Sequence, residues 1–192
     1  SYSGNPLIAL YDVGSLSAVR ERYGVALVQD RQITGFQEKP RDPLSTLAST
    51  ACYVYPKRVQ GYLDLFLASA HPGLDAPGFF NEWCLREQGE SIDAYVFDSY
   101  WYDVGDRQSH LSASRHFTGG ASWIGPAVTQ QDSVIHDSIL LGDSQLRRCR
   151  LTGCVVDTGC LLQDVSLQDC LVGQGTKLIG EKPVSYTHLT LP

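Results

Sequence analysis

The chain has 192 residues, of which 43% are hydrophobic and 19% are charged, as in ordinary globular proteins. Its 15 basic and 21 acidic residues give a net charge of −6, and the absence of an extended basic cluster argues against nucleic-acid binding. No apolar run approaches the roughly 18 residues of a membrane-spanning helix, and no charged-then-apolar leader is present, so we expect a soluble, cytoplasmic protein without a membrane partner.

Strand and helix patterns alternate in the first part of the chain. Apolar or alternating runs predict strands at residues 7–11, 24–29, 33–38, 49–55 and 92–100. Apolar residues at helical spacing predict helices around 59–67 and 79–85, and Asp106 is placed to cap a third helix that ends near Phe117. This alternation indicates an α/β layered domain, which we assign to residues 1–118.

The stretch Tyr95–Asp106 joins this domain to the second half of the chain. A strand that looks buried runs into Trp101-Tyr-Asp-Val-Gly105, so Asp103 is expected where the strand ends. Open α/β sheets bind their ligands at that edge, which makes Asp103 a candidate functional carboxylate. Helix capping and simple surface exposure are the alternative explanations for this Asp.

Residues 119–181 repeat at an offset of 16 residues. Apolar residues fall into rows at this spacing, among them Ile139, Val155 and Leu171, then Leu140, Val156 and Val172, then Leu146, Leu162 and Leu178. The period is too short for helical repeats, whereas a three-sided parallel β-helix needs one inward apolar residue per side. Three hexapeptides would take about 18 residues, so the corners are expected to be shortened, and the repeat alone leaves the handedness open.

Four of the six cysteines lie in rows of small residues within this repeat: Cys149, Cys154, Cys160 and Cys170. None of the six forms a Cys-x-x-Cys pair of the kind that zinc sites use. We therefore interpret the repeat cysteines as compact core residues and expect all the thiols to be reduced.

Four short motifs resemble those of the sugar-1-phosphate nucleotidyltransferases, the nucleotide-sugar pyrophosphorylases. They are Tyr23-Gly24, Glu38-Lys39-Pro40, Thr50-Ala51-Cys52-Tyr53 and Trp101–Gly105, in this order and followed by the repeat. The resemblance covers residues 5–180. It implies the C-terminal part of a Rossmann-like nucleotidyltransferase domain, whose N-terminal part is missing, followed by a left-handed parallel β-helix.

The resemblance also implies roles for individual residues. Glu38 and Gly24 are expected to hold the sugar, Lys39 its phosphate, and Asp103 a Mg²⁺ ion, with Lys39 and Asp103 as the catalytic pair. Tyr53 and Trp101 are expected to form walls of the sugar pocket. Plainer readings remain: a turn glycine at Gly24, a solvated charge pair at Glu38 and Lys39, and core aromatic residues at Tyr53 and Trp101.

Adjacent strand residues point to opposite faces, so Glu38 and Lys39 can serve one site only where the strand ends or bends. Pro40 cannot continue a strand ladder and restricts the residue before it, which predicts a bend at this point.

The chain also departs from the family pattern. Ala51 stands where the family commonly has glycine, and the glycine-rich nucleotide loop and the first metal-binding Asp of the family do not occur in the 192 residues. From this we expect a truncated N-terminus and negligible turnover by residues 1–192 alone. Residues 182–192 break the repeat and are expected to be a non-native tail.

The expected function is transfer of a nucleoside monophosphate from a nucleoside triphosphate to a sugar 1-phosphate, most simply by a glucose-1-phosphate thymidylyltransferase. The base and the sugar are not determined by the sequence. One alternative is a non-catalytic regulatory or assembly subunit of the same fold. Another is acyl transfer by the β-helix through His136. In each case we expect a homo-oligomer assembled through the β-helix.

Overall fold

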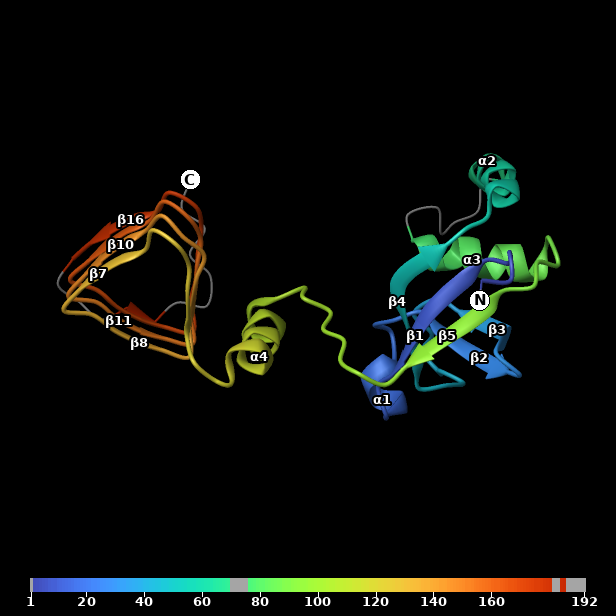
Figure 1. The fold of residues 1–192 in the computed structure, drawn as a ribbon, viewed down its shortest axis with the longest axis horizontal. Helices are drawn as coiled ribbons and strands as arrows, with labels where there is room; N and C mark the ends of the chain where they lie inside the picture. Colours follow the sequence, from blue (N-terminus) through green and yellow to red (C-terminus); the bar gives the residue numbers. More distant parts are fainter. Residues whose placement is uncertain (1, 70–75, 181–183, 186–192) are drawn as a thin grey trace. The chain divides into compact units, whose positions relative to one another are not determined.

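The computed structural model describes residues 2–69, 76–180 and 184–185, and the chain divides into two units, Ser1–Trp101 and Tyr102–Pro192 (Figure 1). The boundary predicted from the sequence, after residue 118, falls at the end of a helix that belongs to the second unit. Most of the expected non-native tail lies outside the described residues. Within it, Val184–Ser185 (β17) pairs in parallel with a strand of the repeat.

The first unit is built on a mixed sheet in which β1 lies between an antiparallel and a parallel neighbour (Figure 1). The antiparallel neighbour is β4 and the parallel one is β5, and single residue pairs join β2 to β4 and β3 to β5 and so close the sheet into a ring. The strands are β1 (Leu7–Asp12), β2 (Val25–Gln29), β3 (Gln32–Gln37), β4 (Leu47–Val54) and β5 (Asp93–Phe97). All five strands predicted from the sequence are present.

Strands β2 and β3 form a hairpin with a two-residue turn at Asp30-Arg31. Both turn residues have a positive φ, 50° at Asp30 and 66° at Arg31, which is the conformation that matches the right-handed twist of a two-residue hairpin. The last residue of β3, Gln37, pairs with the first residue of β2, Val25, so Glu38 lies just beyond the ladder.

Three helices and one 3-10 turn surround this sheet: α1 (Leu16–Val19), η1 (Lys57–Val59), α2 (Gln60–Ala68) and α3 (Pro77–Arg86). The core contains Ile8, Leu10, Phe36, Phe66 and Phe80, all buried. Helix α3 packs on β3 and carries Phe80 and Cys84 into this core. The short helix α1 was not predicted from the sequence. It lies in the polar stretch 15–22, and only its Val19 is buried, so it gives no apolar pattern at helical spacing.

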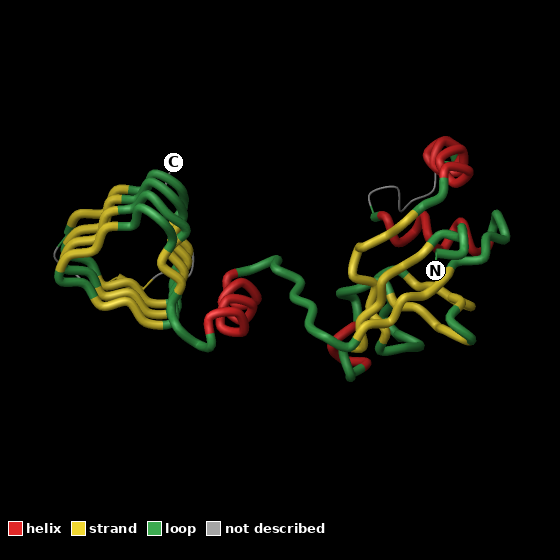
Figure 2. Tube along the Cα trace, viewed as in Figure 1, coloured by secondary structure: helices red, strands yellow, loops and turns green. Residues whose placement is uncertain are grey.

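The second unit is the expected parallel β-helix with coils of 16 residues. Figure 2 shows the strands of successive coils lying over one another on three sides, and each side is a four-stranded sheet. The first side contains β6 (Trp123–Ile124), β9 (Ile139–Leu140), β12 (Val155–Val156) and β15 (Leu171–Val172). The second contains β7 (Thr129–Gln131), β10 (Gln145–Arg147), β13 (Leu161–Gln163) and β16 (Lys177–Ile179). The third contains β8 (Val134–His136), β11 (Arg150–Thr152), β14 (Ser166–Gln168) and β17.

Left-handed backbone conformations turn the corners of the coils. Asp132 and Asp164 have φ values of 51° and 55°, and Asp137 and Asp169 have values of 47° and 54°. Asp tolerates this conformation better than most side chains do. Gly153, at the equivalent corner of the coil between Asp137 and Asp169, has a φ of 63°. Single-residue corners of this kind let a coil close in 16 residues, which is the shortening predicted from the repeat.

The rows of small residues hold successive coils together. The Ser133, Ser138 and Ser144 hydroxyl oxygens accept hydrogen bonds of 3.0 Å from the backbone N–H of Cys149, Cys154 and Cys160, each one coil later. The four repeat cysteines are buried with the inward leucines and valines, as predicted. His136, by contrast, is exposed at the end of β8, and its carbonyl oxygen accepts a hydrogen bond from the Gly153 N–H.

Helix α4 (Arg107–Thr118) begins at Asp106, as predicted, and packs along the first side of the β-helix. The Asp106 side chain accepts a bond of 2.7 Å from the Ser109 N–H in a capping box. Leu111 is buried against Ile139 and Val155. The repeat predicted that both neighbouring apolar rows on this side belong to the core of the β-helix. In the structure only one row faces inward, namely Leu140, Val156 and Val172. The other row packs against α4 and consists of Ile139, Val155 and Leu171.

Two arginines tie α4 to the corner residues. Arg107 Nη1 donates to Asp169 Oδ1 at 3.0 Å and to the Gly153 carbonyl oxygen at 2.8 Å. Arg115 donates two hydrogen bonds to the Asp137 carboxylate, and these bonds lower the pKa of Asp137. A methyl group at Gly153 would lie 2.6 Å from Asp169 Oδ1, so a side chain here would have to displace the Asp169 carboxylate.

We expect a native-state thiol assay to distinguish one cysteine from the other five. Cys52 is exposed, whereas burial raises the pKa of Cys84 to about 12 and of Cys154 to about 11, and the remaining three are buried as well. Because the thiolate is the reactive form, Ellman's reagent should modify Cys52 quickly and the others only after unfolding. Cys52→Ser should remove the fast phase, and any fast thiol left in that variant would contradict the packing described above.

Candidate functional site

Glu38 and Lys39 follow directly after β3, where the backbone bends. Strand β3 ends at Gln37, and Lys39 has a φ of 44°, in the left-handed region. The Pro40 carbonyl oxygen then accepts a hydrogen bond of 3.0 Å from the Glu21 N–H. The two charged residues are therefore outside the strand ladder, at the bend that Pro40 predicted. Glu38 is partly buried and Lys39 is exposed.

The Glu38 carboxylate lies between two glycines that come from different elements. A methyl group built on Gly24, just before β2, would lie 2.7 Å from Glu38 Oε2 and 2.8 Å from Phe36 Cζ. A methyl group built on Gly78, in the first turn of α3, would lie 1.6 Å from the same oxygen. Both distances are shorter than real carbon contacts, so a side chain at either position would require the Glu38 carboxylate to move.

Gly78 did not emerge from the sequence. Residues 71–78 are rich in glycine and proline, a composition typical of loops, whereas Pro77 in fact begins α3. Proline is favoured in the first helical position because its missing N–H has no helical acceptor there. The Pro-Gly pair before an apolar run could have indicated a helix that begins at Pro77. The approach of Gly78 to Glu38, however, depends on how α3 packs against β3.

Burial dominates the electrostatics of Glu38. Loss of water contact raises the pKa of the Glu38 carboxyl, the neighbouring Lys39 charge lowers it, and Glu82 raises it. Glu82 itself pairs with Arg86 at 2.8 Å. The net effect is a carboxyl group that takes up a proton more readily than an exposed glutamate does.

Tyr53 takes part in a small polar network. Its hydroxyl is 3.1 Å from Ser49 Oγ, and the Tyr55 hydroxyl donates to Asn81 Oδ1 at 2.6 Å. Burial raises the pKa of Tyr53, and the Glu38 charge raises it further. The Tyr53 phenol is therefore neutral near pH 7 and able to donate a hydrogen bond.

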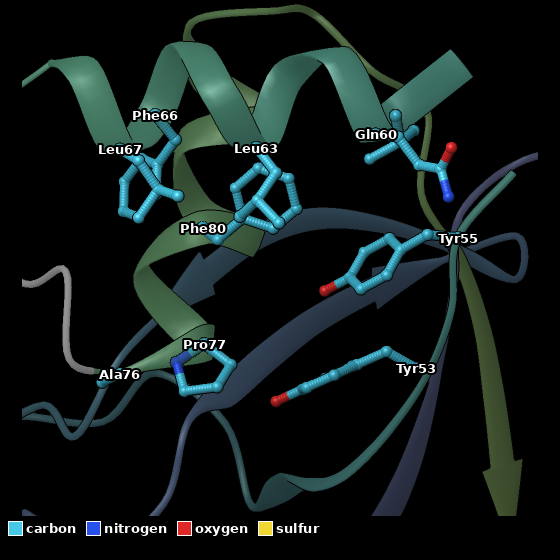
Figure 3. Close-up of a pocket in the computed structure, with 10 residues that line it drawn as sticks. Tyr53, Tyr55, Gln60, Leu63, Phe66, Leu67, Ala76, Pro77 and Phe80 are labelled. Carbon is cyan, nitrogen blue, oxygen red and sulfur yellow. The ribbon is translucent and has the colours of Figure 1, made fainter. Parts of the chain in front are cut away.

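An apolar pocket with a volume of about 310 Å³ opens next to Tyr53 (Figure 3). The rings of Tyr53, in β4, and of Tyr55, just after β4, extend side by side, and Leu63 and Leu67 of α2 face them across the pocket. Pro77, the neighbour of Gly78, also lines it. The pocket therefore adjoins the Glu38 position through two shared elements, Tyr53 and the start of α3.

The backbone before Tyr53 is unusual. Register between β1 and β4 shifts between the pairs Ile8–Tyr53 and Leu10–Ser49, and Ala51 in this bulge has a φ of 61°. Glycine adopts this conformation without strain, whereas alanine does so at a cost of about 1 kcal/mol. The departure from the family pattern at Ala51 therefore falls at a position where the backbone itself favours glycine.

Trp101 packs in a second aromatic group. Its ring centroid is 5.1 Å from that of Tyr23 and 6.0 Å from that of Tyr11, and the group rests on the buried Val19 and Val25. These contacts fit the interpretation of Trp101 as a core aromatic residue. Among them, Tyr23 is the residue next to Gly24, which lies by Glu38. A role for Trp101 as a wall of the sugar pocket stays a prediction.

Asp103 lies at the beginning of the second unit and is exposed. Strand β5 ends at Phe97, earlier than the predicted end at residue 100, so Asp103 is not directly at a strand end. The strand is also less buried than expected, with Tyr95 55% and Val96 48% exposed. Among the described strands β5 has β1 as its only extended partner, and their pairing ends where Phe97 meets Tyr11.

An exposed carboxylate such as Asp103 fits a Mg²⁺ ion that takes one or two protein ligands and completes its shell with water and phosphate oxygens. Over the described ranges, no group of three or more His, Cys, Asp or Glu side chains forms a metal cage. Within the same ranges, no helix is long and apolar enough to cross a membrane.

A double-mutant cycle tests the contact between Gly78 and Glu38. Gly78→Ala should lower the free energy of unfolding by about 1–3 kcal/mol through overlap with the carboxylate. In a Glu38→Ala background most of this loss should disappear, because the overlapping atoms are gone. Urea denaturation measures both, with Gly61→Ala as the control, since a methyl group there meets nothing within 4 Å. Equal losses in both backgrounds would contradict the contact.

The raised pKa of Glu38 predicts how its removal changes stability with pH. A raised acid pKa in the folded state contributes stability at low pH, and that contribution is lost as pH rises through the folded-state value. Glu38→Gln should therefore be more stable than wild type at pH 7–8, with the difference shrinking toward pH 4. Thermal unfolding across this range tests the sign, and a Glu38→Gln variant destabilised at pH 8 would refute it.

The family model "Nucleotidyl transferase" matches residues 12–119. A glucose-1-phosphate adenylyltransferase from Thermomicrobium roseum is 37% identical over 100 residues, which cover 48% of this chain and 22% of that protein. One from Acetivibrio thermocellus is 27% identical over 192 residues, which cover 84% of this chain and 44% of that protein. This chain thus spans less than half the length of these relatives.

Among solved structures, a Bacillus anthracis protein described as a glucose-1-phosphate thymidylyltransferase, in complex with sucrose, is similar with a TM-score of 0.46. Its sequence is 27% identical, and the match covers 58% of this chain and 43% of that one. The family match spans the elements that carry Gly24, Glu38, Lys39, Tyr53 and Gly78. The chain therefore belongs to the nucleotidyl transferase family.

Proposed function

We propose that this chain provides the sugar-phosphate-binding part of an enzyme that transfers a nucleoside monophosphate from a nucleoside triphosphate to a sugar 1-phosphate. The products are a nucleoside diphosphate sugar and pyrophosphate. The observation that carries the proposal is the Glu38 carboxylate, partly buried between Gly24 and Gly78 and followed at once by the exposed Lys39. A carboxylate suits sugar hydroxyls, and an adjacent ammonium suits the phosphate of the same molecule.

In this reaction the sugar-phosphate oxygen attacks the α-phosphorus in line with the departing pyrophosphate, so the protein mainly positions its substrates and neutralises charge. Glu38 accepts hydrogen bonds from the sugar, the Tyr53 hydroxyl donates one, and Lys39 neutralises the phosphate. Asp103 is the proposed protein ligand for Mg²⁺, which when bound stabilises the negative charge of the phosphates.

Glucose 1-phosphate is the proposed reference sugar because the curated relatives are named for it. Relatives named for adenylyl and thymidylyl transfer both occur, so ATP and dTTP are both donors to be tested. We further assign assembly of identical chains to the β-helix, on which Val134 is 54% and Ile179 67% exposed, and a cytoplasmic location to the protein. A purely regulatory subunit would need neither Glu38 nor Lys39.

Titration calorimetry with glucose 1-phosphate tests the site. Glu38→Gln and Lys39→Ala should each weaken binding at least about tenfold, the size of a lost hydrogen bond to a charged group. Lys57→Ala, an exposed lysine of the same unit, is the matched control and should bind as wild type does. Lys39→Ala should also bind glucose 1-phosphate and glucose about equally.

Repeating the binding measurement with glucose 1-phosphate at different pH values gives a second test. Because the pKa of Glu38 is raised, binding should weaken as pH falls through a value above that of ordinary glutamate, and Glu38→Gln should lose this dependence. Wild-type affinity in both Glu38→Gln and Lys39→Ala would show that the sugar phosphate binds elsewhere.

A further inference from the structure

Asn81 of α3 is fully buried, but only one end of its side-chain amide is hydrogen-bonded. Its Oδ1 accepts a hydrogen bond of 2.6 Å from the Tyr55 hydroxyl. Its Nδ2 is also buried and has no hydrogen-bond partner within the part of the chain that the structure describes. A buried N–H group without an acceptor destabilises a folded protein, so this donor is expected to serve a hydrogen bond that the packed fold alone does not complete.

The Tyr53 hydroxyl lies next to this amide. The rings of Tyr53 and Tyr55 have centroids 5.8 Å apart, and Figure 3 shows both hydroxyl oxygens directed toward Pro77, at the start of α3. An amide bound to one hydroxyl is therefore beside the other. Burial is the largest influence on the pKa of Tyr53 and raises it, whereas the Ser49 hydroxyl and the Asn81 amide lower it, as donors to a phenol oxygen do.

We propose that Asn81 is a positioning residue of the sugar site, whose Nδ2–H donates to the Tyr53 oxygen while Tyr53 donates its own proton to a sugar hydroxyl. The inference rests on the proposed function, because it concerns how the sugar is held there. An amide nitrogen donates hydrogen bonds but does not accept them. A Tyr53 oxygen that faces this nitrogen must therefore direct its proton elsewhere, and a sugar offers hydroxyl oxygens as acceptors.

Asn81 acts through Tyr53 and does not touch the sugar itself, because it is fully buried and does not line the neighbouring pocket. Ser49 is the other partner of Tyr53: the two hydroxyl oxygens are 3.1 Å apart, and either can donate. When Tyr53 turns its proton to the sugar, its oxygen can accept from both Ser49 and Asn81. The Asn81 donor is then bonded, which should raise the affinity about fivefold, the size of one neutral hydrogen bond.

A purely structural role for Asn81 is the alternative. In that role the residue only joins α3 to Tyr55, for which the Oδ1 atom is sufficient. Replacing Asn81 would then disturb sugar binding equally whether or not residue 53 carries a hydroxyl. A double-mutant cycle separates the two roles, because it measures the coupling between Asn81 and the Tyr53 hydroxyl directly.

The experiment measures dissociation constants for glucose 1-phosphate by titration calorimetry in Asn81→Leu, in Tyr53→Phe and in the double variant. Asn81→Leu should weaken binding about fivefold in the wild-type background and less than about twofold in the Tyr53→Phe background. Asn81→Asp is a second, nearly isosteric variant, which keeps an acceptor for Tyr55 but loses the amide donor. It should show the same dependence on the Tyr53 hydroxyl and replaces Asn81→Leu if that variant does not fold.

Cys84→Ala is the matched control on the same helix. Cys84 is 1% exposed and packs in the apolar core of the first unit. This variant should therefore unfold at a lower urea concentration than wild type and bind glucose 1-phosphate with unchanged affinity.

The pattern of losses decides between the two roles. A loss of affinity that requires the Tyr53 hydroxyl supports the proposal. Equal losses in both backgrounds show a structural role and overturn it, as does unchanged or higher affinity in Asn81→Leu or in Tyr53→Phe. In those cases a loss of binding in Glu38→Gln leaves the proposed function standing. If the wild-type chain does not bind glucose 1-phosphate, the proposed function fails together with this inference.

Discussion

The candidate site depends on one steric constraint: the Glu38 carboxylate occupies space that a Cβ atom at Gly24 or Gly78 would fill. The constraint links the end of β3, the start of β2 and the first turn of α3, three segments that must pack at fixed separation for the carboxylate to fit. Phe36 adds the wall beneath Gly24. The position of the proposed sugar-binding group therefore follows from backbone packing and does not depend on side-chain hydrogen bonds that a ligand would have to break.

The same constraint has a thermodynamic cost. Taking a carboxylate out of water disfavours its ionised form, and burial is the largest influence on the Glu38 pKa. A protein selected only for stability has no reason to keep such a group beside the apolar wall formed by Tyr53 and Pro77. Local conflict of this kind is characteristic of functional positions, where stability is given up for an oriented polar group.

The second unit is held together differently, by the stacking of short coils. Left-handed corners at Asp137 and Asp169 allow each coil to close, and the same carboxylates then receive Arg115 and Arg107 of α4. The corner row thus serves both the backbone turn and the docking of the helix, while Leu111 covers the outward row that the coils leave apolar. Partly exposed ion pairs contribute little each, so the apolar contact is the main source of stability and the arginines set the register of the helix.

The sequence by itself determined the features that rest on local pattern. The repeat predicted the β-helix because residues 16 apart stack directly, and Pro40 predicted the bend that releases Glu38 and Lys39 from the ladder. Tertiary structure alone decided the partners of these residues. The approach of Gly78 to Glu38, the division of the repeat rows between the core and α4, and the packing of Trp101 on Tyr23 all join segments distant in the chain. No periodicity or propensity records such contacts, because they depend on the distance between surfaces that only the packed fold brings together.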